Sequence, residues 1–365
     1  MLLLAFNIAV FFAKLVFAKN QADNPTTSPT TPAHILVGFP KHISVANKEV
    51  TGIPSWMTVS YPNLLYAVDE SSNALTLFEL NLVSDEITAK SSKEGSYGVV
   101  HLQFNADNTR LVGCAYGNGT IDIWNTTNGS LGLIKTIPSP GQPGPDKERQ
   151  ASPHPHQANL DPNGRFFIVN IIHISPHGCG PRHGIFYPQG AFKATHYILV
   201  CEISNKVLVY TVSYRENYLD FTQIQSTSTF GPRLPPANSS SAAAGAIVLA
   251  ADNRHLYVSN RQTGNSTDSV SHFQIDQLNS TSLSLKFVGS ASTYGVSPRM
   301  MSFSHDDQYL LIANQAGGFG PVALERRLDG TLRAEIPFLF WGGPILLPSL
   351  SSRSIKGYFL PSQHR

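Results

Sequence analysis

The sequence predicts an all-β fold of the β-propeller type. Short apolar runs rich in β-branched and aromatic residues recur along the 365-residue chain, and polar turns with Asp, Asn or Gly separate them. Successive runs begin about 50 residues apart, which leaves room for several short strands in each unit and is typical of propeller blades. Sustained 3.6-residue periodicity, which a helical repeat requires, does not occur.

Six units show this repeat, each with an apolar hexamer, a polar turn and a second short strand. We expect each hexamer to form the innermost strand of its blade. A further strand, HILVGF at 34–39, is expected to join another blade that the chain's other end closes. The hexamers are LLYAVD (64–69), RLVGCA (110–115), RFFIVN (165–170), YILVCE (197–202), HLYVSN (255–260) and YLLIAN (309–314).

Two places break the repeat. The third unit runs from RFFIVN through IIHISPHG directly into CGPRHG. Relative to the other units, about twenty residues are missing there, enough for two strands. The second break is the C-terminal text from 333 to 365, which is rich in Pro, Leu and Ser and has no strand–turn pattern. We therefore expect a propeller domain at 34–332 with one truncated blade, followed by an atypical tail.

The N-terminus predicts secretion. Residues 1–18 are mostly apolar and end in Val16-Phe17-Ala18, which fits a signal peptide with a small-residue cleavage site. The alternative is an N-terminal membrane anchor, for which the apolar run is short. Residues 19–33 are rich in Pro and Thr and predict a disordered leader. After cleavage we expect no membrane association.

Six Asn-X-Ser/Thr sequons accompany the predicted signal peptide. Together they indicate a glycosylated extracellular protein, because this motif is the acceptor for N-glycans in secreted chains. The sequon residues are Asn118, Asn125, Asn128, Asn238, Asn265 and Asn279.

Composition and motifs exclude several classes of function. Charged residues make up 14% of the chain and the net charge is +2 without a basic stripe, so a nucleic acid is not the expected partner. Common motifs of nucleotide hydrolysis, zinc proteolysis, serine hydrolysis and EF-hand calcium binding are absent from the sequence. The chain is also too aromatic and too weakly charged for wholesale disorder.

The three cysteines, Cys114, Cys179 and Cys201, form no zinc-binding or redox spacing. An odd number allows at most one disulfide among them. The favoured interpretation is that they are small buried thiols without a role.

The segment SPHPHQANLDPNG at 152–164 contains the first candidate site residues. In an extended segment His154 and His156 project to the same face. They can act as metal ligands, with His173, His177 or His183 as a third ligand, or as a general acid and base. The alternative is a pair of turn or surface histidines.

The segment CGPRHG at 179–184 contains the second candidate. Pro and Gly restrict the backbone there, so Arg182 and His183 are held in place. A fixed arginine near a propeller axis can bind a carboxylate or phosphate through two hydrogen bonds. The alternative is a surface salt bridge.

Three further charged residues occupy related positions. Glu202 follows four apolar residues, so we expect partial desolvation to raise its pKa, although it can also cap the next turn. Arg261 lies at the corresponding place one unit later, and Arg299 in SPRMMSF resembles Arg182 in its surroundings. Because equivalent positions of successive blades converge on one channel, we expect His156, Arg182, Glu202 and Arg261 to meet.

These motifs resemble the lactonase family with a seven-bladed β-propeller, which includes 6-phosphogluconolactonase and a fungal carboxy-cis,cis-muconate cyclase. The likeness extends from about His34 to Leu332. It rests on LLYAVDE, HPHQANLDPNGRF, GPRHGIF, LYVSNR and PRMMSFSHDDQYLLIANQ. With the predicted leader and sequons, the chain is similar to a secreted, fungal-like branch. The truncated unit and the tail depart from the family pattern.

The resemblance implies a site without a cofactor or metal at one mouth of the central channel. It implies catalytic roles for His156, Arg182, Glu202 and Arg261. From the residues we add His154, His183 and Arg299 as substrate-binding candidates.

The expected function is therefore lactone hydrolysis or lactone formation on a small anionic organic acid or its lactone. The arginines would stabilise developing negative charge, and His156 or Glu202 would move the proton. The alternative from a different class is a secreted propeller that serves as a binding platform or cell-wall antigen.

Overall fold

The computed structural model describes residues 52–60, 62–81, 84, 86–169, 175–232, 234–279, 282–304, 306–318 and 321–334. For 12–15, 35–39, 42–44 and 48–49 it gives the course of the backbone. These residues form strands β1–β26 and one 3-10 turn, η1 (Thr127–Gly129).

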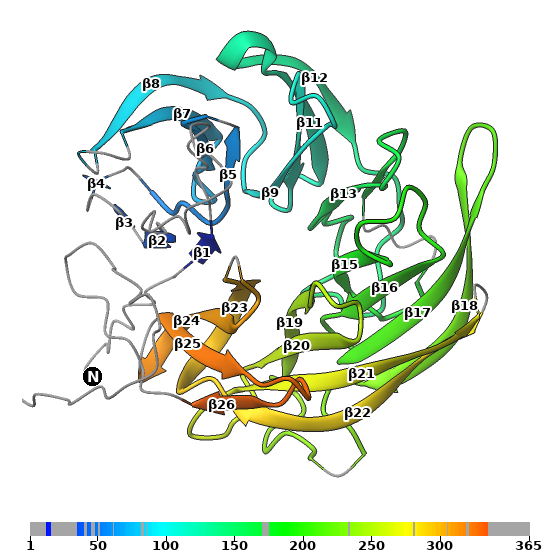
Figure 1. The fold of residues 1–365 in the computed structure, drawn as a ribbon. Helices are drawn as coiled ribbons and strands as arrows, with labels where there is room; N and C mark the ends of the chain where they lie inside the picture. The colour runs from blue at the N-terminus through cyan, green and yellow to red at the C-terminus, as the bar shows by residue number, and fades with distance from the viewer. Residues whose placement is uncertain are drawn as a thin grey trace, which may run out of the picture.

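The strands are arranged as seven sheets around a central axis, as Figure 1 shows. In the described part of the chain, six sheets have four strands and one has two. Neighbouring strands are consecutive in the chain and antiparallel, so hairpins connect them. The first strand of each sheet lies nearest the axis and the last lies at the outside (Figure 1). The prediction of a β-propeller is confirmed.

The first three sheets come from the N-terminal half. Their strands are β1 (Phe12–Leu15), β2 (Ile35–Phe39), β3 (His42–Ser44) and β4 (Lys48–Glu49); β5 (Met57–Ser60), β6 (Leu64–Val68), β7 (Ala74–Asn81) and β8 (Glu86–Glu94); and β9 (Val99–Phe104), β10 (Arg110–Ala115), β11 (Thr120–Asn125) and β12 (Gly132–Pro138).

The remaining four sheets follow in chain order. Their strands are β13 (Ala158–Leu160) and β14 (Phe167–Val169); β15 (Pro181–Tyr187), β16 (His196–Cys201), β17 (Lys206–Tyr214) and β18 (Leu219–Ser228); β19 (Ala243–Leu249), β20 (His255–Arg261), β21 (Ser269–Asn279) and β22 (Ser282–Ser292); and β23 (Gly295–Phe303), β24 (Tyr309–Gly318), β25 (Pro321–Arg326) and β26 (Leu332–Ala334).

The apolar hexamers form the second strand of each sheet, so the expectation that they are innermost is wrong. YILVCE, for example, contains β16, which lies between β15 and β17. The innermost strands are harder to recognise in the sequence because several of them contain polar residues among the apolar ones. β15 has the sequence PRHGIFY and β23 the sequence GVSPRMMSF.

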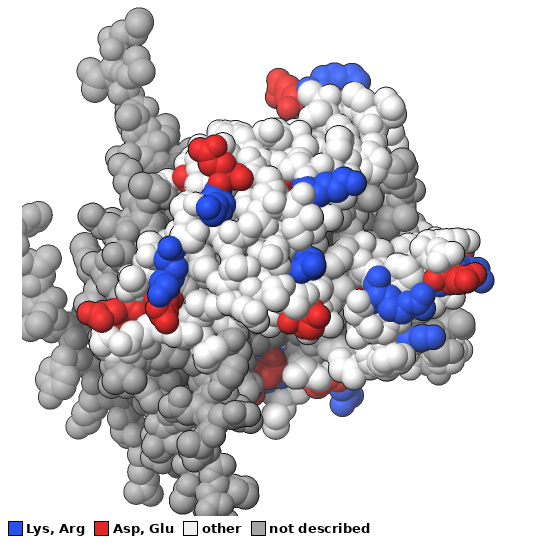
Figure 2. Space-filling view, turned by 90° about the horizontal axis from the view of Figure 1, so that it is seen from above, with Lys and Arg blue, Asp and Glu red and all other residues white. Residues whose placement is uncertain are grey.

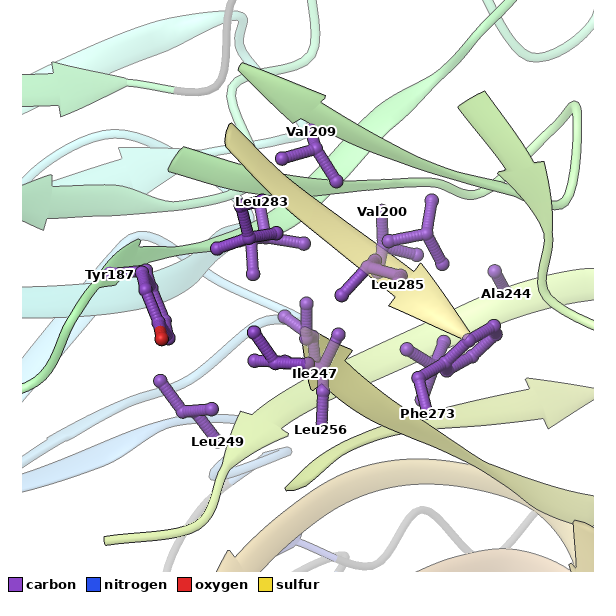
Figure 3. Packing of buried hydrophobic residues seen from close by; sticks show 14 residues of the cluster. Tyr187, Val200, Val209, Ala244, Ile247, Leu249, Leu256, Phe273, Leu283 and Leu285 are labelled. Atoms are coloured by element: carbon purple, nitrogen blue, oxygen red, sulfur yellow. The ribbon is translucent and has the colours of Figure 1, made fainter. Parts of the chain in front are cut away.

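The hydrophobic core lies between successive sheets. All six residues of β16 are buried, and alternate side chains serve two different clusters. Ile198 and Val200 pack with residues of β19–β22, as Figure 3 shows for the labelled Val200, whereas Tyr197 and Leu199 pack on the other face. Burial on both faces explains why the hexamers are uninterrupted apolar runs.

The first sheet differs from its prediction. HILVGF forms β2, but its neighbours β1, β3 and β4 also come from the N-terminal part of the chain. The strand next to the axis is β1, which pairs with β2, contacts β23 and lies inside the predicted signal peptide. Closure by the chain's other end is therefore not found among the described residues, and the predicted tail beyond Ala334 lies outside them.

Several surface features bear on the predicted location. Five sequon asparagines are exposed, and Asn125 is half-buried. In the described part of the chain no helix is long and apolar enough to cross a lipid bilayer. Basic and acidic side chains are interspersed on the face drawn in Figure 2. Secretion and glycosylation stay predictions.

The truncated unit is a two-stranded sheet, β13 and β14, which we call the short blade. Residues Ala158–Leu160 pair with Phe167–Val169, and the next described strand, β15, begins the following sheet. The structure thus agrees with the prediction that two strands are missing here. On the side away from β13, β14 has no neighbouring strand within the described chain.

We expect this short blade to limit stability and to promote self-association, because an edge strand presents unpaired N–H and C=O groups. Inserting about twenty residues after Ile174, patterned on the β11–β12 hairpin, should raise the melting temperature by several degrees and reduce association. Light scattering and calorimetry of both chains test this. A monomeric unmodified chain that melts at about 45–65 °C, as ordinary domains do, would contradict it.

Candidate active site

Arg182 and His183 lie in a β-bulge near the start of β15. The register of β15 against β16 shifts between Pro181 and Gly184, so one extra residue is accommodated in β15. Bulges re-aim side chains that would otherwise alternate between faces. Both consecutive side chains are consequently buried, with 1% of Arg182 and 3% of His183 exposed.

Glu202 directly follows β16 and is the centre of three ion pairs. Nε of Arg182 lies 3.0 Å from Oε2 of Glu202. Nη2 of Arg261 lies 3.0 Å from Oε1, and Nη2 of Arg149 lies 2.6 Å from the same Oε1. The structure therefore brings together Arg182, Glu202 and Arg261, which were expected to meet, and adds Arg149.

Arg261 ends β20 and is fixed by the strand beside it. Its Nη2 donates a hydrogen bond to the carbonyl of Ala244 at 3.2 Å. Gly245 makes room for this side chain, since a Cβ there would lie 3.2 Å from Cδ of Arg261 and 2.4 Å from Oγ of Ser259. A glycine at this position thus permits the close approach of the arginine stem.

The expectation of a raised pKa for Glu202 is wrong. Burial by itself raises the pKa of this carboxyl group, but the attraction of Arg261, Arg182 and Arg149 outweighs burial and lowers the pKa to about 2. Glu202 is thus firmly ionised at neutral pH. It neutralises arginines and is poorly suited to act as a general base.

His156 lies two residues before β13 and is 6% exposed. Its ring packs edge-on against His183, with ring centroids 5.0 Å apart. Nδ1 of His183 in turn accepts a hydrogen bond from Nη1 of Arg182, and the two nitrogens are 3.3 Å apart. The three side chains form a continuous row from the pocket into the interior.

The surroundings of His156 favour its neutral form. Burial lowers its pKa well below the ordinary value, and the charges of Arg182 and the nearby His183 lower it further. Nδ1 of His156 is buried without a hydrogen-bond partner among the described residues. Such a nitrogen can take up a proton or hold a water or substrate group.

His154 lies nearer the surface and has a different partner. Its Nδ1 is 2.7 Å from the carbonyl oxygen of Tyr116, so this nitrogen carries the proton and donates it. The two rings stack with centroids 4.3 Å apart. Tyr116 also contacts His156 edge-on at 5.8 Å, so the tyrosine ring joins both histidines.

A pocket that is partly open to solvent lies over these groups. Its wall includes His154, His156, Arg149, Glu202 and Tyr116. Among the described residues that line it, Arg149 and Glu202 are the charged ones. The pocket therefore presents a neutral histidine beside a carboxylate that is held by arginines.

Arg182, His183, Arg261 and Arg299 are not in the wall of this pocket. Arg182 and Arg261 pair with Glu202 from its buried side. Nη2 of Arg299 makes two hydrogen bonds to Glu70, at 2.9 and 3.0 Å. The charge of Arg299 nevertheless acts on His156 and Glu202.

We examined whether the histidines near the site are grouped as metal ligands. Within the described residues, no three His, Cys, Asp or Glu side chains are grouped closely enough to hold one. His173, one candidate third ligand, lies outside the described residues. His177 is exposed and His183 contacts Arg182 instead.

Comparison with known families agrees with this architecture. Residues 41–171 and 172–326 match the family described as "Lactonase, 7-bladed beta-propeller". The chain belongs to this lactonase family. The two matched stretches include every site residue named above.

Some of the curated relatives of this lactonase-family chain, though not all, are named as lactonases. It is 30% identical over 259 residues to a probable 6-phosphogluconolactonase of Arthroderma benhamiae, and the match covers 64% of this chain and 64% of that relative. It is 24% identical over 293 residues to the 6-phosphogluconolactonase of Bacillus subtilis, covering 73% of this chain and 78% of that relative.

Solved structures share the fold. The periplasmic gluconolactonase PpgL of Pseudomonas aeruginosa aligns with a TM-score of 0.70 and 21% identity over 87% of this chain and 94% of that one. A putative 6-phosphogluconolactonase of Bacteroides fragilis aligns with a TM-score of 0.65 and 23% identity over 84% and 90% of the two chains.

The interpretation of the cysteines as unpaired thiols is wrong for two of them. Cys179 and Cys201 form a disulfide, with Cα atoms 4.8 Å apart, while Cys114 is a buried free thiol. The bridge joins the segment before Arg182 to the residue before Glu202. The disulfide therefore links the two segments that carry Arg182 and Glu202, which form an ion pair with each other.

Sequence reasoning missed Arg149, Glu70 and Tyr116. Arg149 lies in the connection from β12 to β13, which is far longer than an ordinary hairpin loop. The length of this connection could have indicated a functional loop, because long loops of compact domains are often functional. Glu70 could also have been identified from the sequence, since it directly follows the hexamer LLYAVD.

Proposed function

We propose that this lactonase-family chain hydrolyses a small lactone that bears an anionic group. The observation that carries the proposal is the triple ion pair on Glu202 beside the neutral His156 at one pocket. The lactonase names of the curated relatives support the same reaction class.

The charge balance favours an anion. Four guanidinium groups, of Arg149, Arg182, Arg261 and Arg299, stand against the two carboxylates of Glu202 and Glu70. Among the described residues, these ion pairs therefore contain two more guanidinium groups than carboxylates. Because guanidinium groups stay protonated at neutral pH, this region has a positive potential that attracts a carboxylate or phosphate.

His156 is the group best suited to move the proton. As base, it takes a proton from water while the water oxygen bonds to the lactone carbonyl carbon. The carbonyl oxygen becomes an oxyanion, which the positive potential of Arg182 and Arg261 stabilises. The ring C–O bond then breaks, and His156 returns the proton to the leaving alkoxide, giving the open hydroxy acid.

A lactone-forming addition, which is a different reaction from reversed hydrolysis, would use the same groups. In it, a substrate carboxylate would bond to one carbon of a conjugated double bond, the arginines would stabilise the enolate that develops, and protonated His156 would give a proton to the enolate carbon. The names of the relatives favour hydrolysis over this muconate-cyclase chemistry. Location outside the cell stays part of the proposal, resting on the signal and sequon motifs.

The proposed lactonase function can be tested by measuring the protons that lactone hydrolysis releases. The protein should hydrolyse 6-phosphogluconolactone above the spontaneous rate, and His156→Gln should lower kcat about 100-fold. Arg215→Gln is the matched control, because Arg215 is exposed and pairs only loosely, at 3.4 Å, with Asp220. A folded protein that neither opens lactones nor closes carboxymuconate would overturn the proposal and favour the binding-platform alternative.

A further inference from the structure

We propose that Arg149 is the residue that selects ligands by their anionic substituent. It would bind the carboxylate or phosphate that the ligand carries away from its reacting ester. This inference rests on the proposed lactonase function and adds a specificity-determining residue to it. Arg149 comes from the β12–β13 connection rather than from a strand.

The backbone under Arg149 is ordered by its own turn. Oδ1 of Asp146 accepts hydrogen bonds from the N–H groups of Glu148 and Arg149, each at 3.1 Å. The N–H of Gln150 donates to the carbonyl of Asp146 at 2.7 Å, and the N–H of Gly144 donates to the carbonyl of Gln150 at 2.8 Å. The arginine is thus held ready to bind, which lowers the entropy lost on ligand binding.

Arg149 differs from its two neighbours in accessibility. Its side chain is 34% exposed, compared with 2% for Arg182 and 8% for Arg261. It also lines the pocket, which the other two do not. A ligand entering from solvent therefore meets the Arg149 guanidinium before the buried pair.

The ion pair of Arg149 is suited to exchange with a ligand. Oε1 of Glu202 is shared between Arg149 and Arg261, and Oε2 is paired with Arg182. Glu202 thus keeps two buried partners if Arg149 turns towards an anion. Among the described residues, Glu202 is the one carboxylate in ion-pair contact with Arg149, and this contact uses one of five N–H donors.

The test compares charged and neutral lactones with Arg149→Gln. For 6-phosphogluconolactone and for a glucarolactone, we expect KM to rise about 10- to 100-fold, because hydrogen bonds to charged groups contribute that much. For neutral glucono-δ-lactone, KM should rise several-fold less than for the charged lactones, so that the variant loses much of its preference for charged over neutral lactones. Comparing the two charged lactones distinguishes phosphate from carboxylate as the preferred group.

Two further sets of measurements distinguish a failure of this inference from a failure of the lactonase proposal. Arg149→Lys should restore part of the affinity, and Arg215→Gln should leave all constants unchanged. Calorimetric titration with 6-phosphogluconate and gluconate needs no turnover, and Arg149→Gln should weaken binding of the phosphorylated acid selectively. Equal effects on charged and neutral ligands, no effect on either, or no anion binding by the wild type would overturn the role of Arg149.

Discussion

Replacing Arg182 with Ala should lower the rate of lactone hydrolysis about 100-fold, since loss of one preorganised positive group costs about that much in comparable sites. Arg182 is the most buried of the three arginines around Glu202, and through His183 it is joined to His156. Its removal therefore weakens both the positive potential and the support of the proposed base. Steady-state hydrolysis of 6-phosphogluconolactone measures the effect.

The controls separate lost chemistry from lost folding. Arg182→Lys keeps the charge but not the forked geometry, and should recover only part of the rate. Arg299→Ala should do less than Arg182→Ala, because Arg299 pairs with Glu70, whereas Arg182 pairs with Glu202 and contacts His183. Circular dichroism should show β structure in every variant. Equal rates for wild type and Arg182→Ala, with both folded, would remove Arg182 from the site.

The propeller was predictable because its signals are local and repeated. The hexamers are uninterrupted apolar runs because both of their faces are buried, and a polar turn follows each one. The assignment of RFFIVN to the innermost strand failed because the true innermost strand, β13, is only Ala158–Leu160. Short strands beside a channel bury little apolar surface and so leave little trace in the sequence.

The candidate site was only partly predictable, for a different reason. Glu202 and Arg261 lie at the ends of the second strands of neighbouring blades, which the repeat makes visible, whereas Arg182 comes from the innermost strand of the same blade as Glu202. Arg149 reaches the same carboxylate from a loop 53 residues away along the chain, and no periodicity indicates this. The sign of the pKa shift of Glu202 depends on that count of arginines, so burial alone gave the wrong direction.

Replacing Glu202 with Gln should destabilise the fold at pH 7 by about 3–5 kcal/mol, because it leaves buried arginines without their counter-charge. The free energy of unfolding in urea measures this loss. Glu79→Gln is the matched control: Glu79 pairs with Lys90 at 2.9 Å, but both side chains are about half exposed, so little should change.

The pH dependence of this loss follows from the lowered pKa of Glu202. The carboxyl has an ordinary pKa of 4.5, which is lowered to about 2 in the folded protein. A lowered carboxyl pKa stabilises the fold fully above its unfolded value, and this contribution disappears as the pH falls through the folded value.

The wild type should thus lose stability relative to Glu202→Gln between about pH 5 and pH 2. Buried neutral histidines such as His156 also destabilise the fold in acid, but they are present in both proteins, so the difference between the two isolates the carboxylate. Urea titrations at pH 7, 5, 4 and 3 measure that difference. A stability difference that stays constant across this range would mean that Glu202 is not held ionised by the arginines, and the charge balance proposed for the pocket would be wrong.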